Sequence, residues 1–268
     1  MCLILFSYQA NDEFPLVVAA NRDERFQRAT RLAQFWPETP SLLAGQDLEA
    51  GGTWLGITRN GRFAAITNFR GLSATQTSNP LSRGHLTSQF LLSTQAASDY
   101  AESTLSRGSQ YQGFNLLLFD GKHFVYCNNL NQTQSIMTVE PGIYGLSNGL
   151  LDAPWPKIEK GKQALNRLIH NKTAPLHTED LLALLRDDQF AEENTLPNTG
   201  VNRDLERRLS PLFISSSDPE GSLNGYGTCN STAIIIDRQR QVNFHERSFY
   251  QPPLQQNPID QKVHFMLE

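Results

Sequence analysis

The chain has 268 residues, of which 39% are hydrophobic and 19% are charged, and its formal net charge is −4. This composition is typical of a globular protein with a sizeable core, and it excludes disordered and fibrous classes. The acidic balance and the lack of a long basic run argue against nucleic-acid binding. No apolar stretch approaches the ~20 residues of a transmembrane helix, so we expect no integral membrane segment.

The cysteine and histidine spacing excludes several kinds of site. Three cysteines, Cys2, Cys127 and Cys229, are too few and too scattered for a disulfide framework. Their odd number, together with an N-terminus that makes a poor signal peptide because it lacks a basic region, predicts a cytoplasmic protein. Neither Cys-x-x-Cys nor His-x-x-x-His occurs, so we expect no metal site and no required cofactor.

The first half of the chain is predicted to form β-strands at residues 2–8, 15–20, 53–58 and 62–67. The first two strands form a hairpin, and their continuous apolar character suggests that both faces are covered. Asn60-Gly61 joins the next two strands, and Asn-Gly between apolar runs is a strong hairpin signal. Residues 29–52 are expected to be irregular because of their prolines and glycines, and residues 71–80 are expected to form an exposed loop.

Helices and strands alternate in blocks through the rest of the chain. The predicted helices cover residues 82–92, 96–105, 156–169, 178–186 and 203–208, and Ser82 is expected to cap the first of them. The predicted strands cover residues 114–120, 123–128, 134–146, 232–237 and 241–249. Hairpins join adjacent strands, so the class is α+β with mostly antiparallel sheets. We favour a single domain over residues 1–268 rather than a split near residue 150.

Cys2 is the most informative residue for function, because removal of Met1 would make it the N-terminal residue. A terminal cysteine carries its own base, since a free α-amine has a pKa of ~7.7–8.0 and a thiol a pKa of ~8.5. One residue would then supply both the nucleophile and the proton acceptor. The alternative is a small apolar side chain that begins a core strand.

The segment Asn21-Arg22-Asp23-Glu24 follows directly after the second apolar strand and is expected to end it. If the hairpin register brings this segment beside Cys2, Asp23 can hydrogen-bond the α-ammonium and orient it. Arg22 can then lower the pKa of the thiol. The alternative is a turn that ends the strand and carries a surface ion pair.

Further candidates follow other predicted strands. Asn68 and Asn148 can donate side-chain N–H groups to a developing oxyanion, with ordinary turn residues as the alternative. Trp54 lies between glycines and is a candidate pocket wall, or else a core residue. The candidates for holding an acidic substrate group are Arg70, Arg83 and Arg247, whose alternative role is a solvated surface.

Together these segments resemble the NRDE family, whose eukaryotic members include transport and Golgi organisation protein 2. The matching motifs are Met1-Cys2, Asn21-Arg22-Asp23-Glu24, Gly51-Gly52-Thr53-Trp54-Leu55-Gly56, Thr67-Asn68-Phe69-Arg70, Ser82-Arg83-Gly84, Phe114-Asn115-Leu116, Gly145-Leu146-Ser147-Asn148, Tyr226-Gly227-Thr228 and Glu246-Arg247. Each motif alone is weak, but nine in the family's order over essentially the whole chain are a specific signal.

The resemblance implies an N-terminal-nucleophile hydrolase fold, a four-layer αββα sandwich of two mostly antiparallel sheets. In related cysteine-type members, such as penicillin V acylases and bile salt hydrolases, the terminal cysteine attacks an amide carbonyl. An Arg-Asn-x-Asp motif follows the second strand there; Asn21 and Asp23 match it, whereas Ala20 stands in place of the arginine. Asn148 resembles the later oxyanion-hole asparagine, and Cys229 stands where the family usually has arginine.

The leading hypothesis is a hydrolase of a non-peptide amide or thioester that uses Cys2 as nucleophile. The family's links to haem trafficking and to acyl-CoA or lipid metabolism give a second hypothesis, a non-catalytic carrier. Haem would then be a ligand, with His85, His123, His245 or a cysteine as axial candidates. In both cases the partner is a small amphiphile: an acyl amide, an acyl-CoA or haem. A third hypothesis is a partner-binding scaffold on a decayed enzyme fold.

Overall fold

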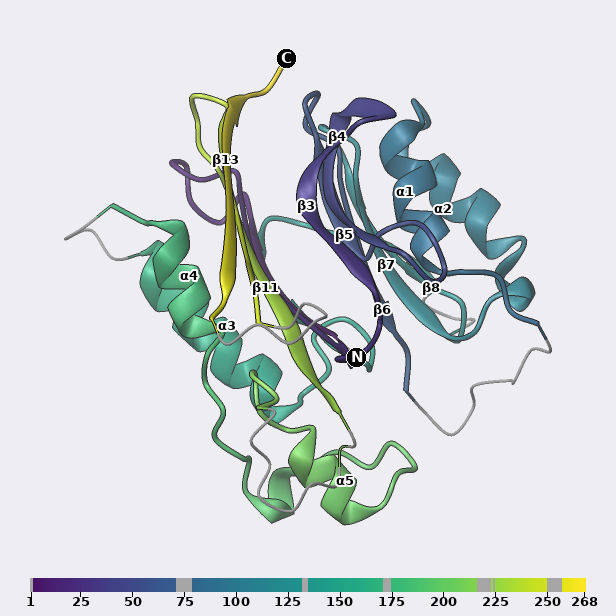
Figure 1. Cartoon of the computed structure of the whole chain (residues 1–268), viewed down its shortest axis with the longest axis vertical. Coiled ribbons are helices and arrows are strands. Elements are labelled where there is room, and N and C mark those ends of the chain that lie inside the picture. The colour runs from purple at the N-terminus through teal and green to yellow at the C-terminus, as the bar shows by residue number, and fades with distance from the viewer. Residues whose placement is uncertain are drawn as a thin grey trace. The chain divides into compact units, whose positions relative to one another are not determined.

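The chain forms two antiparallel sheets, each with helices packed on it (Figure 1). The computed structural model describes residues 2–70, 79–131, 135–170, 175–215, 223, 225–249 and 257–268. One compact unit comprises Met1–Gln27, Pro141–Ser147 and Leu151–Phe265, and the other comprises Arg28–Glu140, Asn148–Leu150 and Met266–Glu268. The predicted α+β class is therefore confirmed, while the single domain over residues 1–268 stays a prediction.

The first unit contains a six-stranded sheet in the order β10-β1-β2-β11-β12-β13. Its strands are β1 (Cys2–Tyr8), β2 (Leu16–Arg25), β10 (Gly142–Leu146), β11 (Tyr226–Ile236), β12 (Gln241–Ser248) and β13 (Ile259–Met266). The helices α3 (Pro156–Ile169) and α4 (Thr178–Leu184) pack on one face of this sheet, and α5 (Arg203–Arg208) lies later in the same unit (Figure 1). A short 3-10 helix covers Glu193–Thr195.

The face of this sheet that the helices cover is set by the alternation of side chains along the strands. Leu3 and Leu5 of β1 and Val17 and Ala19 of β2 form one apolar cluster with residues of α3 and α4. Successive side chains of a strand point to opposite faces. The odd-numbered residues at this end of β1 and β2 therefore face the helices, and the even-numbered residues face away from them.

The second unit contains a seven-stranded sheet in the order β3-β4-β5-β6-β7-β8-β9. Its strands are β3 (Thr30–Trp36), β4 (Thr39–Asp47), β5 (Leu55–Thr58), β6 (Phe63–Asn68), β7 (Phe114–Phe119), β8 (Phe124–Asn128) and β9 (Ile136–Thr138). The helices α1 (Gly84–Leu92) and α2 (Ala97–Leu105) pack on it through a separate apolar cluster (Figure 1). A 3-10 helix covers Gly108–Gln110.

Three sequence-based predictions about these elements are wrong. Residues 29–52 were expected to be irregular, but they contain β3 and β4. Pro40 is tolerated because it lies at the start of β4, before the residues that pair with β5. The strand β13 was not predicted, and its alternation of partly buried and exposed residues gives it few apolar positions. Ser82 does not cap α1, which begins at Gly84 without a side-chain capping bond.

A fourth correction concerns the motif Asn21-Arg22-Asp23-Glu24. It does not end the second strand, because β2 continues through Arg25. Asn21, Arg22 and Asp23 are buried inside the strand and pair with residues of β1 and β11. The predicted strand end at this motif is therefore wrong, as is the alternative of a turn with a surface ion pair, and its polar groups from Asn21 to Asp23 belong to the interior of the sheet.

None of the helices in the described ranges is both long and apolar enough to span a bilayer. The predicted loop at residues 71–80 lies almost entirely outside the described residues, as does Met1.

Two of the motifs that support the family resemblance meet in the second unit. Gly51 and Gly52 adopt left-handed backbone conformations with φ of 69° and 75°. The Thr53 N–H donates to the Gly84 carbonyl at 3.1 Å. A Cβ added to Gly52 would lie 2.4 Å from the Gly84 carbonyl carbon. The glycines therefore allow the turn before β5 to pack directly against the start of α1.

We expect Gly52→Ala to lower the free energy of unfolding by more than about 2 kcal/mol, since it adds backbone strain and a clash with Gly84. Gly200→Ala is the matched control, because Gly200 also has a left-handed φ, of 92°, but is exposed. It should cost only about 1 kcal/mol. Urea unfolding followed by circular dichroism measures both values, and equal losses would contradict the role of the close approach.

Candidate active site

The pairing of β1 with β2 sets the position of Cys2. Cys2 lies directly opposite Arg22, and Ile4 lies opposite Ala20. Cys2 is partly exposed at the start of β1, whereas the other residues of the strand are buried. The arginine that the related motif has at position 20 would face Ile4 here, and Arg22 instead provides a guanidinium on the strand position opposite the thiol.

The strand β2 divides the motif between the two faces of the sheet. Cys2 and Arg22 share the face that points away from α3 and α4, since paired residues of adjacent strands point to the same side. Asn21 and Asp23 have odd positions and point to the helix-covered face. The predicted cluster is thus brought together in the first unit, but as a thiol and guanidinium on one side and an amide and carboxylate on the other.

Burial is the main influence on the Cys2 thiol and raises its pKa. Arg22 and a hydrogen bond from the backbone N–H of Asp23 both act to lower the pKa, because they stabilise the thiolate. The carboxylate of Asp23 acts in the opposite direction. The net effect raises the pKa of the Cys2 thiol. Without a base to take its proton, the thiol is therefore protonated at neutral pH.

Asp23 is only 2% exposed, and burial raises the pKa of its carboxyl group. Several neighbouring groups oppose that shift, among them the positive charge of Lys157 and a hydrogen bond from Thr228 Oγ1 to Asp23 Oδ1, 2.7 Å long. The Thr228 hydroxyl in turn accepts the backbone N–H of Ile214 at 2.9 Å. Tyr226 Oη donates to the backbone carbonyl of Asp23 at 3.0 Å, so both the backbone and the side chain of Asp23 are fixed.

Asn21 is an anchor for the chain that covers this face. Its side-chain nitrogen donates to the carbonyls of Leu185 and Leu212, at 3.0 and 2.8 Å. Its oxygen accepts the hydroxyl of Ser231 at 2.5 Å. These bonds use both amide hydrogens and hold two segments that are distant in sequence against β2.

The second unit holds the predicted oxyanion donors. Asn148 Nδ2 donates to the Asn68 carbonyl at 2.7 Å, and the Arg70 N–H donates to the Asn148 carbonyl at 2.7 Å. The two asparagines are therefore brought together at the end of β6. In the first unit, Ser147 Oγ, from the residue before Asn148 in the chain, donates to the Cys2 carbonyl at 3.0 Å.

The predicted substrate-binding residues have structural contacts as well. Trp54 packs at the edge of the second unit's core, where a Cβ on Gly45 would lie 2.4 Å from its ring. Arg83 Nη1 donates to the Gly113 carbonyl at 2.9 Å. Both contacts fix the loops that carry these residues, and their predicted roles in binding stay predictions.

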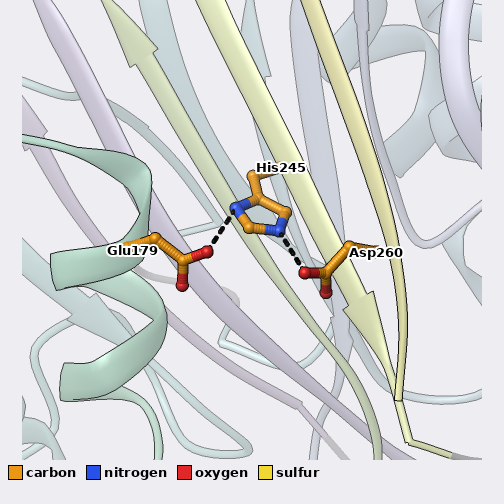
Figure 2. A group of neighbouring side chains, drawn as sticks. All are labelled: Glu179, His245 and Asp260. Carbon is orange, nitrogen blue, oxygen red and sulfur yellow. Dashed lines mark ion pairs between the residues drawn. The ribbon is translucent and has the colours of Figure 1, made fainter. Parts of the chain in front are cut away.

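Arg247 belongs to a charged cluster in the first unit. Its guanidinium binds both carboxylate oxygens of Asp260, at 2.7 and 2.8 Å, and Glu179 at 3.3 Å. Lys262 also binds Glu179, at 3.2 Å. Figure 2 shows His245 between the two carboxylates: Nδ1 is 3.9 Å from Glu179 and Nε2 is 3.4 Å from Asp260. The cluster ties α4 and β13 to β12.

Glu179, His245 and Asp260 have the ligand types of a metal site, and one ligand atom from each lies within 4.8 Å of the others. Two features argue against a bound cation. The nearest contacts of the two carboxylates are with different nitrogens of the ring (Figure 2). Arg247 and Lys262 already neutralise both carboxylates. We interpret the cluster as an ion-pair network around a buried histidine.

The candidate axial ligands for haem lie in different surroundings. His85 is exposed, and its Nε2 lies beside Gly51. His123 is 69% exposed next to Asp120, whereas His245 is buried in the charged cluster. Cys127 is fully buried in the second unit's core, and burial raises the pKa of its thiol to about 12.

Two residues of the site were not predicted as functional: Lys157 and Thr228. Lys157 begins a buried stripe on α3 that continues with Gly161, Leu165 and Ile169. That spacing of four residues marks the buried face of a helix, so the sequence contained a signal for a buried lysine. Thr228 was noted only as part of a family motif, and no local pattern connects it with Asp23.

Comparison with known proteins supports one family over nearly the whole chain. The family model for "Transport and Golgi organisation 2" matches residues 1–251. The chain belongs to the Transport and Golgi organisation 2 family. A mouse Transport and Golgi organization 2 homolog is 34% identical over 260 residues, covering 92% of this chain and 93% of the relative. The Drosophila Transport and Golgi organization protein 2 is 25% identical over 272 residues and covers 92% of each chain.

The fold of this family member is also found among solved structures. The C2A mutant of a conjugated bile acid hydrolase from Clostridium perfringens matches with a TM-score of 0.50 and 8% sequence identity. The match covers 100% of this chain and 97% of the hydrolase. The N-terminal-nucleophile hydrolase-like fold that the resemblance implied is therefore confirmed.

In this Transport and Golgi organisation 2 family member, we expect Arg22→Met to move the pH midpoint of Cys2 alkylation upward, because the guanidinium lowers the pKa of the thiol. Iodoacetamide labelling at a series of pH values, followed by mass spectrometry of the Cys2 peptide, measures the midpoint. Arg25→Met, at an exposed position of the same strand, should leave it unchanged. An unchanged midpoint in Arg22→Met would contradict the electrostatic role.

The charged cluster predicts a pH dependence of stability. Burial lowers the pKa of His245 despite the opposing effect of Asp260 and Glu179. On acidification the unfolded chain therefore takes up this proton first, and the folded state loses stability as the pH falls through the ordinary range for histidine. The pKa values of both carboxylates are lowered, so they stay charged in that range.

We expect the free energy of unfolding of the His245→Gln variant to fall less than that of the wild type when the pH is lowered from about 7.5 to 5.5. Urea unfolding at both pH values measures the difference. His170→Gln, at an exposed site after α3, should retain the wild-type pH dependence. If His245→Gln and the wild type lose the same free energy of unfolding, the proton uptake does not come from this histidine.

Proposed function

We propose that this protein is an N-terminal-nucleophile hydrolase that cleaves a non-peptide amide or a thioester through Cys2. One observation carries the proposal: the β1–β2 register aligns Cys2 with Arg22 and leaves Asp23 one position further along. Because the strands are antiparallel, the α-nitrogen of Cys2 points toward Asp23. Removal of Met1 would therefore leave a free amine beside a buried carboxylate.

The proposed reaction is an acyl transfer. The Cys2 sulfur attacks the carbonyl carbon, and the α-amine takes the proton of the thiol. The α-ammonium then protonates the leaving amine or thiolate as its bond to the carbonyl carbon breaks. Water hydrolyses the resulting thioester at Cys2, with the α-amine again as base, and regenerates the free thiol.

The surrounding residues have distinct proposed roles. Asp23 accepts a hydrogen bond from the α-ammonium and orients it, while Arg22 favours the thiolate. Asn21 keeps the covering segments on the far side of β2 through its bonds to Leu185 and Leu212. Asn148 or Asn68 is proposed to donate an N–H to the oxyanion of the tetrahedral intermediate, an assignment that rests on the sequence resemblance.

A second candidate function is a non-catalytic carrier of haem or an acyl-CoA-like amphiphile in the cytoplasm. One observation favours it: burial raises the pKa of the Cys2 thiol, and a protonated thiol is a poor nucleophile. A hydrolase overcomes this only if the α-amine is present to take the proton. The state of the N-terminus therefore separates the two candidates.

We expect the purified protein to lack Met1 and to gain one acyl group at Cys2 when it is mixed with reactive acyl amides or thioesters. Intact-mass spectrometry measures both changes. Cys2→Ala should abolish acylation and lower turnover by at least about 1,000-fold, since the nucleophile is lost. Cys229→Ala is the matched control, because Cys229 is a buried thiol in the same sheet.

A processed protein that acylates with none of these compounds would contradict the hydrolase. The carrier predicts that Cys2→Ala keeps its binding of haem or acyl-CoA, measured by a Soret shift or by calorimetry. Absence of binding in the wild type would contradict the carrier.

A further inference from the structure

A buried lysine lies on the helix-covered face of the first sheet. Lys157 is 4% exposed in the first turn of α3, and its Nζ donates to the Leu209 carbonyl at 3.0 Å. The helix approaches the sheet closely here, because a Cβ on Gly145 of β10 would lie 2.6 Å from Ile158. Burying an ammonium group is unfavourable unless a nearby negative charge compensates it.

The segment of residues 209–214 connects Lys157 to the proposed site. Lys157 binds the carbonyl of its first residue, Asn21 binds the carbonyl of Leu212, and Thr228 binds the N–H of Ile214. The Thr228 hydroxyl also donates to Asp23. Lys157 and Asp23 therefore lie on one face of the sheet, under one short segment that polar groups hold at both ends.

The charges of the two buried groups are complementary. The positive charge of Lys157 favours the ionised form of Asp23, as the hydrogen bond from Thr228 does, and both act against the effect of burial. Arg22 has the same sign of effect, but it lies on the opposite face of the sheet. Lys157 is thus a side-chain cation that acts on Asp23 from the helix-covered side of β2.

We propose that Lys157 is a positioning residue of the nucleophile site: its buried ammonium, held under residues 209–214 on the same face as Asp23, offsets the burial of the Asp23 carboxylate, so that Asp23 can hold the α-ammonium of Cys2. The inference rests on the proposed function for the role of the α-amine. The charge pairing of Lys157 with Asp23 can be tested without any turnover. Lys157 acts through Asp23 and does not touch the substrate.

The test uses Lys157→Gln, which removes the charge but keeps an N–H donor for the Leu209 carbonyl. Protein labelled with ¹³C at the aspartate carboxyl carbons is titrated by NMR, and loss of one signal in Asp23→Asn identifies Asp23. The ionisation midpoint of Asp23 should move upward by about one pH unit in Lys157→Gln. Lys160→Gln is the control, since Lys160 is on the exposed side of α3 and pairs with Asp187.

An unchanged Asp23 midpoint in Lys157→Gln would overturn the proposal. The functional readout is the rate of Cys2 acylation at neutral pH, which should fall in Lys157→Gln but not fall further when that change is added to Asp23→Asn. A purely structural role would lower the rate in both backgrounds. If no compound acylates Cys2, the hydrolase proposal fails while the NMR result still decides the role of Lys157.

If Lys157→Gln does not fold alone, the double variant Lys157→Gln/Asp23→Asn provides the decision. It removes both charges, so it should recover the circular dichroism spectrum and thermal transition of the folded protein. Failure of the double variant to fold would contradict a compensating pair.

Discussion

The antiparallel pairing of β1 with β2 is the constraint on which the candidate site depends. It aligns Cys2 with Arg22 and directs the start of the strand toward Asp23. A slip of β1 by one residue would turn the thiol to the helix-covered face. Leu3 and Leu5 prevent that slip, since it would move their buried side chains out of the cluster under α3 and α4. The core of the first unit thus fixes the register that assembles the chemistry.

At the motif, the side chains on the helix-covered face of β2 are polar and buried, so they need hydrogen-bond partners within the protein. Asn21, Asp23 and Thr228 are each at most 2% exposed, and their side chains bond to one another's strands or to the covering segments. Unsatisfied groups at this depth would cost about 1–3 kcal/mol each. The segment of residues 209–214 supplies the backbone partners. It is therefore part of the site, although it contributes no reactive side chain.

The sequence predicted most strands and helices because apolar runs and turn residues mark them clearly. It failed where neighbours outside the local pattern decide the structure. The polar motif beginning at Asn21 was interpreted as the end of a strand, but partners on β11 allow the strand to continue through it. Cys2 and Asp23 were proposed as site residues because their chemistry is specific. Lys157 was not, since its role depends on a contact across the fold, although its helical spacing marked it as buried.

The raised pKa of the Cys2 thiol and the burial of the Asp23 carboxylate both fit a nucleophile site once the α-amine of Cys2 is included. A thiol that is protonated at rest does not need a preformed thiolate if a base on the same residue takes the proton as the bond forms. An amine with an ordinary pKa of ~7.7–8.0 can take the thiol proton at neutral pH under two conditions. Its charged form must not be so stable that the amine is already protonated, and burial must not prevent the charged form from existing. Asp23 stabilises the ammonium and burial destabilises it. The positive charge of Lys157 bears on this balance, because it favours the ionised form of Asp23 against the effect of burial.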